Sequence, residues 1–264
     1  FYTNLINNLS FYVLMKSPKV LIGCPTFIGK KYCINKYLNG LRDLDYDEKY
    51  FTIVDNSKGD EYIKLLEKKG IKALKGPHYP DDPARSVYES RNLLREKFLE
   101  GDFEYFLSLE QDVVLPRDGL KTLLENNQRV VSGVYFVLTE VNNKPAMAPM
   151  AFVKVDQEWF DKIKKNPKTY KDQYEMLKKH DFDINKVVRR LRLPEVKGEN
   201  SMEVQRVGLG AMLIHRDVLE KIKFRKNPNG FDDMTFCEDV LKNNWKIMLD
   251  TGVKCQHFLE KGGE

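Results

Sequence analysis

Short hydrophobic runs alternate with segments of helical periodicity in the N-terminal part of the chain. The apolar runs at 19–26, 51–54 and 71–74 are strand-length, and the first two are followed by proline or turn-forming residues. Between these runs, apolar side chains recur every three or four residues over 30–44 and again in a segment that stops at Gly70, which predicts amphipathic helices. Strand, helix, strand, helix and strand at these lengths predict a parallel sheet with right-handed crossovers.

The stretch Phe103–Pro116, FEYFLSLEQDVVLP, joins a predicted buried strand to two acidic residues. Glu110 and Asp112 follow the strand directly, and parallel α/β folds bind their ligands outside the carboxyl ends of the strands. Two carboxylates this close repel each other unless a cation lies between them. A hard divalent cation that holds a diphosphate would meet this need, whereas a polar turn at the strand end would require no ligand.

The hydrophobic pattern in the second half of the chain predicts more strands, together with a region of different composition. The expected strands are at 130–138, 147–155, 202–207, 211–214, 246–249 and 253–258, with helices after Pro116, at 216–222 and opening near Phe236. Between 156 and 197, strand character is weak and pairs of basic residues recur. We expect a mostly helical insertion here, within a single domain that spans 15–264, and its basic residues to be a solvated face.

Composition narrows the range of partners. The chain has 264 residues with 42% hydrophobic content, 31% charged residues and a formal net charge of only +5. This balance is compatible with a small anionic substrate and disfavours nucleic acid. No run of 18 apolar residues occurs, so we expect no transmembrane segment.

Cysteine usage and the first residues suggest a location. The four cysteines show no CxxC spacing, and we interpret them as reduced thiols of a cytoplasmic protein. Residues 1–14 are expected to form an extension that is foreign to the native chain, because Met15 stands directly before the first strand. The alternative is a short amphipathic anchor that makes the protein peripheral to a membrane.

Polar residues follow several other predicted elements. Thr26 and Asp55 end the first two strands, where they could contact a nucleotide or simply close a turn. Arg91 lies on the helix before the acidic stretch and could pair with a diphosphate or form a surface ion pair. Gly208 and Gly210 allow close approach of a ligand, or serve a bulge or turn.

Two features lie further along the chain. Glu238 and Asp239 are expected at the start of a helix, where they could complement its dipole or supply a general base. His257, near the end of the last strand, could be a core histidine. It could also join Asp112 in an octahedral site, a ligand set that Mn²⁺ accepts better than Mg²⁺.

Taken in order, these pieces resemble the GT-A glycosyltransferases of the large family-two-like group, over roughly 19–258. The resemblance is carried by Asp55 in IVDNS, Arg91-Asn92, Glu110-Gln111-Asp112 at the position of the DxD motif, and the segment 207–214. It ends with Glu238-Asp239 at the position of the ED pair and His257 at that of a late metal-binding histidine.

The resemblance implies a mixed, mainly parallel sheet flanked by helices, and an enzyme that transfers a sugar from a UDP- or GDP-sugar donor. The acceptor would be a glycan, a lipid-linked molecule or a protein. Asp112 and His257 would hold a divalent metal, with Mn²⁺ favoured over Mg²⁺. The implied nucleotide-binding residues are Thr26, Asp55, Arg91 and Glu110. Asp239 would be the base of an inverting reaction, with Glu238 orienting the acceptor.

Two alternatives stay open. A sugar-phosphate nucleotidyltransferase uses a related sheet, although the segment Gly23–Gly29 lacks the glycine-rich, arginine-bearing phosphate loop of that chemistry. A nucleotide-sugar-binding module without turnover is the other, because the motif has glutamate where the family has its first aspartate.

Overall fold

The computed structural model describes residues 17–141, 144–228 and 231–259. The expected extension at 1–14 lies outside the described residues. Within the described residues, none of the helices is both long and apolar enough to cross a membrane. All four cysteines are buried free thiols, as the sequence predicted for their redox state.

The centre of the molecule is an eight-stranded sheet with the order β11-β14-β6-β13-β4-β1-β2-β3. Strand β1 runs parallel to β2 and β4, β2 runs parallel to β3, and β13 runs antiparallel to both β4 and β6. The strands are β1 (Val20–Thr26), β2 (Lys49–Asp55), β3 (Ala73–Lys75), β4 (Tyr105–Leu109), β6 (Val130–Val134), β11 (Ser201–Val204), β13 (Ala211–His215) and β14 (Ile247–Lys254). This arrangement confirms the predicted mixed, mainly parallel α/β sheet.

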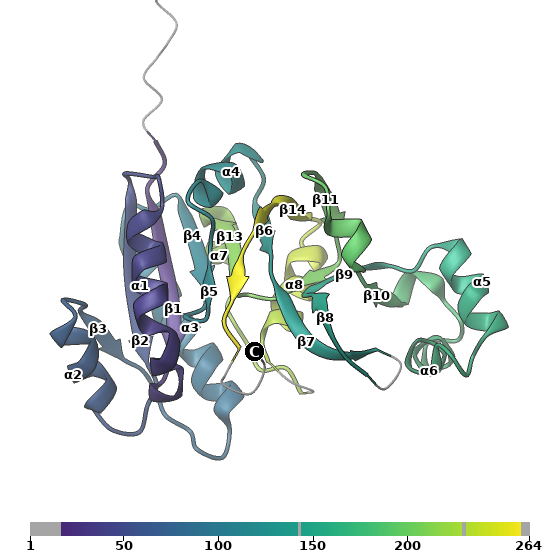
Figure 1. Ribbon diagram of the computed structural model, residues 1–264, viewed down its shortest axis with the longest axis horizontal. Helices are drawn as coiled ribbons and strands as arrows, with labels where there is room; N and C mark the ends of the chain where they lie inside the picture. Colours follow the sequence, from purple (N-terminus) through teal and green to yellow (C-terminus); the bar gives the residue numbers. More distant parts are fainter. Residues whose placement is uncertain (1–16, 142–143, 229–230, 260–264) are drawn as a thin grey trace, which may run out of the picture.

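Helices pack on both faces of this sheet (Figure 1). The helical elements before the insertion are η1 (Ile28–Cys33), α1 (Ile34–Asp43), α2 (Glu61–Lys68), α3 (Pro83–Glu100) and α4 (Gly119–Glu125), and those after it are α7 (Arg216–Lys221) and α8 (Asp233–Lys242). Side chains of α1, α2 and α4 share one core with the sheet, while those of α3, α7 and α8 share a second core on its other face.

The strand sequences explain why there are two cores. Successive side chains of a strand point to opposite faces, so strands covered on both sides must be apolar at every position. In β13, Ala211 and Leu213 enter the first core, while Met212 and Ile214 enter the second. The continuous hydrophobic runs in the sequence therefore correspond to strands buried between two helical layers.

Smaller sheets accompany the main sheet. A hairpin is formed by β7 (Phe136–Val141) and β8 (Lys144–Pro149), and β9 (Ala151–Lys154) pairs with β10 (Val188–Arg190) and β12 (Arg206–Val207). The strands β5 (Val113–Val114) and β15 (Gln256–His257) form a short antiparallel pair. The single strand expected at 147–155 is thus two strands, with Met150 between them.

The region 156–197 contains α5 (Gln157–Lys165), α6 (Lys171–Lys179), the short helices η2 (Ile184–Lys186) and η3 (Leu193–Val196), and β10. Helices α5 and α6 lie at the end of the molecule opposite β3 (Figure 1). They enclose a small core built on Val155, Ile163, Leu177 and Val187. An ion pair between Arg189 and Glu195, at 2.8 Å, joins β10 to η3 beside this core.

Glu195 should make the stability of this region depend on pH. Burial opposes its ionisation, but hydrogen bonds from Arg189 and Arg192 lower the pKa of Glu195 to about 2. A carboxyl group whose pKa falls on folding stabilises the protein above its unfolded-state pKa, and this contribution is lost as the pH falls toward the folded-state value. The relevant window lies between the ordinary value of 4.5 and about 2.

We therefore expect Glu195→Gln to lower the free energy of unfolding by about 2 kcal/mol at pH 7, since Arg189 loses a charged partner. The difference from the unmodified protein should shrink as the pH falls below 4.5. Urea unfolding at pH 7, 5 and 3.5 measures both effects. Glu158→Gln is the control, because Glu158 forms an exposed pair with Lys162 in the same region. A deficit that stayed constant across these pH values would contradict the linkage.

Candidate active site

The register of the main sheet gathers the predicted polar residues at one edge. Thr26 pairs directly with Asp55 at the ends of β1 and β2. Strand β4 ends beside them at Leu109, so the acidic motif Glu110-Gln111-Asp112 leaves the sheet at the same edge. This edge is the carboxyl end of the parallel strands, where the sequence placed a ligand site.

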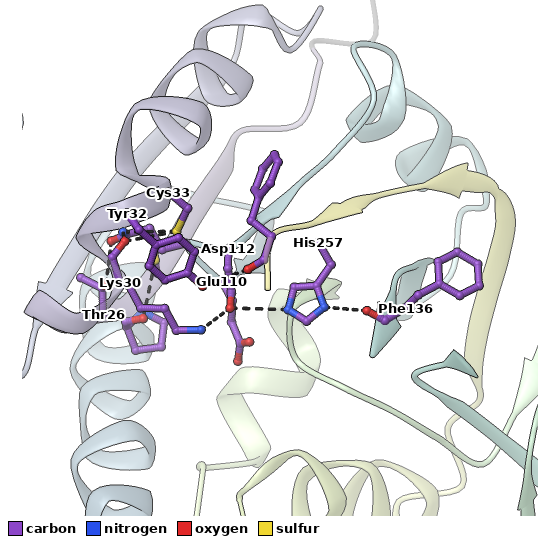
Figure 2. Close-up of polar contacts among 12 residues, drawn as sticks. Thr26, Lys30, Tyr32, Cys33, Glu110, Asp112, Phe136 and His257 are labelled. Carbon is purple, nitrogen blue, oxygen red and sulfur yellow. Dashed lines mark hydrogen bonds and ion pairs between the residues drawn. The ribbon is translucent and has the colours of Figure 1, made fainter. Parts of the chain in front are cut away.

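Asp112 lies between the side chains of Lys30 and His257. Lys30, on η1, donates to Oδ2 of Asp112, and Nε2 of His257 lies 3.5 Å from the same oxygen. Figure 2 shows Lys30 and His257 approaching the carboxylate from opposite sides. The other oxygen, Oδ1, is buried and has no hydrogen-bond partner among the described residues. One carboxylate oxygen is thus shared and the other is unsatisfied.

The pairing of β15 with β5 places His257 at Asp112. His257 stands opposite Val113, and the Phe258 amide donates to the Asp112 carbonyl at 2.7 Å. Nδ1 of His257 lies 2.6 Å from the Phe136 carbonyl, which requires that Nδ1 carry the proton. Nε2 is therefore the ring nitrogen directed at Asp112. The sequence prediction that His257 and Asp112 meet agrees with this geometry.

Asp112 and His257 each stabilise the charged form of the other. Burial disfavours the ionised form of Asp112, but hydrogen bonds and charge from His257 and Lys30 lower its pKa below the ordinary value. Burial also disfavours imidazolium, yet the hydrogen bonds to Asp112 and to the Phe136 carbonyl raise the pKa of His257. Asp112 is therefore an anion at neutral pH.

Gln111, the middle residue of the motif, points away from these groups and ties three elements together. Its Oε1 accepts hydrogen bonds from Thr26 at 2.6 Å and from Tyr62 on α2 at 2.7 Å. Its Nε2 donates to the Lys30 carbonyl at 2.5 Å. Thr26 is only 3% exposed, so its hydroxyl is directed at Gln111.

Arg91 links Glu110 to the start of α8. Its two terminal nitrogens contact Glu110 and Asp232, each at 2.5 Å. The side chain of Arg91 is 2% exposed and that of Asp232 is 1% exposed, so the alternative of a surface ion pair is wrong. A direct contact between Arg91 and a diphosphate would require breaking one of these two pairs.

Glu110 is held in a less favourable setting than Asp112. Burial and the nearby Asp112 raise the pKa of Glu110, and the Arg91 charge opposes the rise. The side chain of Glu110 remains 35% exposed, whereas that of Asp112 is 5% exposed. The two acids of the motif therefore have separate cationic partners, Arg91 for Glu110 and Lys30 for Asp112.

Asp55 is fully buried in a turn. Its Oδ1 accepts from the Ser57 amide at 2.9 Å and from the Ser57 hydroxyl, while Oδ2 lies 3.4 Å from Lys75. The turn-closing role that the sequence offered as an alternative is present in the structure. Contact between Asp55 and a nucleotide would require this turn to open.

The expectation that Glu238 and Asp239 lie at the start of a helix is wrong. Helix α8 begins at Asp233, not near Phe236, which puts both residues in its second half. Both oxygens of Asp239 are paired with Arg225, at 2.6 and 2.9 Å, and Glu238 lies 3.4 Å from Arg206. The Arg225 hydrogen bond lowers the pKa of Asp239.

Asp232 and Asp233, at the N-terminus of α8, occupy the place at which the ED pair was expected. Asp232 contacts Arg91, whereas Asp239 lies seven residues farther along the chain, or about 10 Å along a helix. Asp233 is half-buried beside Asp232. The acidic doublet in FDDMTF, after the turn-rich NPNG, was the sequence signal for this start of a helix.

Tyr135 explains the two glycines after β12. A Cβ on Gly208 would lie 1.8 Å from the Tyr135 hydroxyl oxygen, and one on Gly210 would lie 2.8 Å from the ring. The ring of Tyr135 also packs edge-on against His257, with 5.5 Å between ring centroids. Close packing of Tyr135 therefore requires the glycines, and Tyr135 in turn supports the imidazole.

The donor set is suited to a divalent cation that also binds other ligands. The His257 Nε2 atom faces Oδ2 of Asp112, and Oδ1 of the same buried carboxylate is unsatisfied; a carboxylate beside an imidazole suits Mn²⁺. Within the part of the chain that the structure describes, no cluster of three His, Cys, Asp or Glu residues is arranged as a complete metal site. The remaining ligands would come from a bound diphosphate and water.

Removing Arg91 should destabilise the protein strongly. We expect Arg91→Met to cost about 3–5 kcal/mol of unfolding free energy, because the buried Asp232 would lose its partner. Arg91→Lys should cost less, since an ammonium keeps one of the two pairs. The control is Arg85→Met on the same helix, where the pair with Glu89 is exposed. Urea denaturation measures all three; equal losses for Arg91→Met and Arg85→Met would refute this role of Arg91.

The fold is shared with solved glycosyltransferase structures. S. aureus TarS, residues 1–349, in complex with UDP-GlcNAc, matches with a TM-score of 0.52 and 16% identity over 93% of this chain and 60% of that one. GalNAc-T7 with UDP, GalNAc and Mn²⁺ matches with a TM-score of 0.63 and 9% identity, over 94% and 45%.

A third match is the mannosyltransferase PcManGT from Pyrobaculum calidifontis with GDP-Man and Mn²⁺, with a TM-score of 0.56 and 14% identity over 94% and 59%. The chain thus spans about half to three fifths of these three structures. No protein family profile matches the sequence, and no curated protein matches it. The likeness in three dimensions shows that the chain has a GT-A fold.

Proposed function

We propose that the protein is a metal-dependent glycosyltransferase that moves a sugar from a nucleotide-diphosphate donor to an acceptor hydroxyl. The observation that carries the proposal is the position of Asp112. It is an ionised, buried carboxylate with one unsatisfied oxygen and faces His257 at the carboxyl edge of a GT-A sheet. The similar structures contain UDP-GlcNAc, UDP with GalNAc, and GDP-Man, which supports a UDP- or GDP-sugar donor.

Different residues at the sheet edge would bind different parts of the donor. The nucleoside would lie over the ends of β1 and β2, near Thr26 and Asp55. Asp112 and His257 would hold Mn²⁺ or Mg²⁺, which neutralises charge on the leaving diphosphate when bound. Glu110, fixed by Arg91 and partly exposed, would face the donor ribose or a water molecule of the metal shell. The GalNAc-T7 and PcManGT structures contain Mn²⁺, which favours that ion.

Asp233 is the carboxylate that we propose as general base of an inverting transfer. It lies at the first position of α8, where the Asp232–Arg91–Glu110 chain fixes the helix against the acidic motif. Asp232 is almost fully buried and engaged by Arg91, whereas Asp233 is partly exposed. A base must reach the hydroxyl that it deprotonates, so accessibility favours Asp233. The acceptor would be a glycan, a lipid-linked molecule or a protein.

Donor binding tests the metal site directly. We expect UDP or GDP to raise the melting temperature in the presence of Mn²⁺, and Asp112→Asn to remove that increase because the site loses its anion. Thermal shift with nucleoside diphosphates and nucleotide sugars, with and without Mn²⁺, measures this. Asp118→Asn is the control, since Asp118 follows the motif but lies at the start of α4. Indifference of the unmodified protein to every nucleotide would contradict the proposed function.

The assignment of the base is tested with two variants of one helix. Asp233→Asn should reduce sugar transfer about 10²–10⁴-fold while nucleotide affinity stays within a factor of two. Asp239→Asn, at the far end of α8 and paired with Arg225, should transfer at close to the unmodified rate. Release of nucleoside diphosphate from the preferred donor, in the presence of acceptor, gives the rates. The opposite ranking would return the base to Asp239, and pyrophosphate release from sugar 1-phosphate and nucleoside triphosphate would indicate nucleotidyl transfer instead.

A further inference from the structure

We propose that Lys30 is a built-in counter-ion of the metal site, which holds the cation position at Asp112 until a divalent metal displaces it. The inference rests on the proposed function, because it assigns Asp112 and His257 to a metal. Lys30 would then be a specificity-determining residue that makes the site take up metal together with a nucleoside diphosphate instead of metal alone.

The contact geometry supports direct competition. Lys30 donates to Oδ2 of Asp112, the oxygen that Nε2 of His257 also faces at 3.5 Å. In Figure 2 the ammonium and the imidazole meet at this single oxygen. A metal ion coordinated by both Asp112 and His257 would have to lie between these two groups. A divalent ion there would share Oδ2 with the Lys30 ammonium, and repulsion between the two cations would weaken the contact of Lys30 with Asp112.

The backbone of Lys30 is fixed independently of its side chain. The Lys30 carbonyl accepts hydrogen bonds from Gln111 at 2.5 Å and from the Cys33 thiol at 3.2 Å. The Lys30 amide donates to the Phe27 carbonyl at 2.9 Å. Since Gln111 belongs to the acidic motif, the same segment that presents Asp112 also positions the start of the Lys30 side chain.

The Lys30 side chain can rotate while its backbone stays fixed. It is 31% exposed, whereas that of Asp112 is 5% exposed. Four methylene groups separate the ammonium from the fixed Cα, so rotation about them can carry the charge several ångströms without moving η1. The ion pair thus joins a buried anion to a partly exposed cation.

The balance of charge explains why a cation is needed when no ligand is bound. The charged groups around the site are Glu110, Asp112, Asp232 and Asp233 on one side and Arg91 and Lys30 on the other, with the His257 imidazole beside Asp112. Arg91 is occupied by Glu110 and Asp232, so Lys30 is the permanent cation that compensates Asp112. A metal ion added at Asp112 would lie close to the like charge of Lys30, which is paired with the same carboxylate. A diphosphate changes this balance, because it offers Lys30 another anion at the same edge.

Two consequences follow for binding. The metal alone should bind weakly, because it must displace Lys30 into water. Metal and nucleoside diphosphate should bind with positive coupling, because each favours the arrangement in which Lys30 has left Asp112. Loss of the Lys30 charge should therefore strengthen binding of the metal alone and weaken the coupling.

The first experiment titrates the full chain with Mn²⁺ alone and follows free Mn²⁺ by electron paramagnetic resonance. We expect Lys30→Met and Lys30→Gln each to lower the Kd for Mn²⁺ about tenfold, as removal of a like charge close to the site predicts. Lys31→Met, an exposed neighbour on η1, should stay within twofold of the unmodified protein. Asp112→Asn combined with Lys30→Met should abolish the gain.

The outcome that overturns the proposal is equally specific. Unchanged or weaker Mn²⁺ binding by both Lys30 variants, with unchanged unfolding curves, would show that Lys30 does not compete. A gain in Lys30→Met alone would indicate a packing effect, since Lys30→Gln removes the same charge, and it would also count against the proposal. A tenfold gain that persists without Asp112 would place the metal elsewhere and would overturn it as well.

A second titration separates this inference from the proposed function. With UDP or GDP present, the coupling between nucleotide and Mn²⁺ should fall at least about fivefold in Lys30→Met, because the diphosphate loses a cationic partner. Failure of every variant to bind nucleotide would contradict the proposed function while leaving the Mn²⁺-only result to stand. A coupling that is unchanged by Lys30→Met would contradict the role of Lys30.

Discussion

The ionised carboxylate of Asp112 is the constraint around which this end of the molecule is organised. A buried anion is costly unless it is paired and hydrogen-bonded, and here the compensation comes from parts of the chain far apart in sequence. Lys30 arrives from the segment after β1, and His257 arrives on the last strand pair. The main sheet has to place the ends of β1 and β4 side by side for these contacts to form.

The other two residues of the motif, Glu110 and Gln111, connect it to the surrounding elements. Gln111 connects the motif to β1, η1 and α2, while Glu110 uses Arg91 to reach the start of α8. The three consecutive residues therefore face three different supports. Tyr135, which needs glycine at 208 and 210, packs against His257 and completes the frame. A motif of this kind is defined as much by what holds each side chain as by its acidic members.

The sequence predicted the parts of the fold that depend on local pattern. Hydrophobic runs located the strands of the doubly covered sheet, and the meeting of Asp112 with His257 was expected from the acidic motif and the late histidine. The position of α8 was missed because Phe236–Val240 carries strong apolar periodicity, while the helix in fact starts at the acidic pair Asp232-Asp233. Partners such as Lys30 for Asp112 and Asp232 for Arg91 depend on tertiary register, which periodicity does not contain.

The short strand pair that carries His257 has a consequence for how the protein is made. The Asp112 contacts span 82 residues to Lys30 and 145 to His257, so the candidate site consists entirely of long-range contacts. Contacts of this separation form late, because a large loop must close before they contribute. A ribosome-bound chain could form β1, β2 and β4 while Asp112 still lacked its imidazole. The candidate site would then be complete only after His257 has been synthesised and β15 has paired with β5.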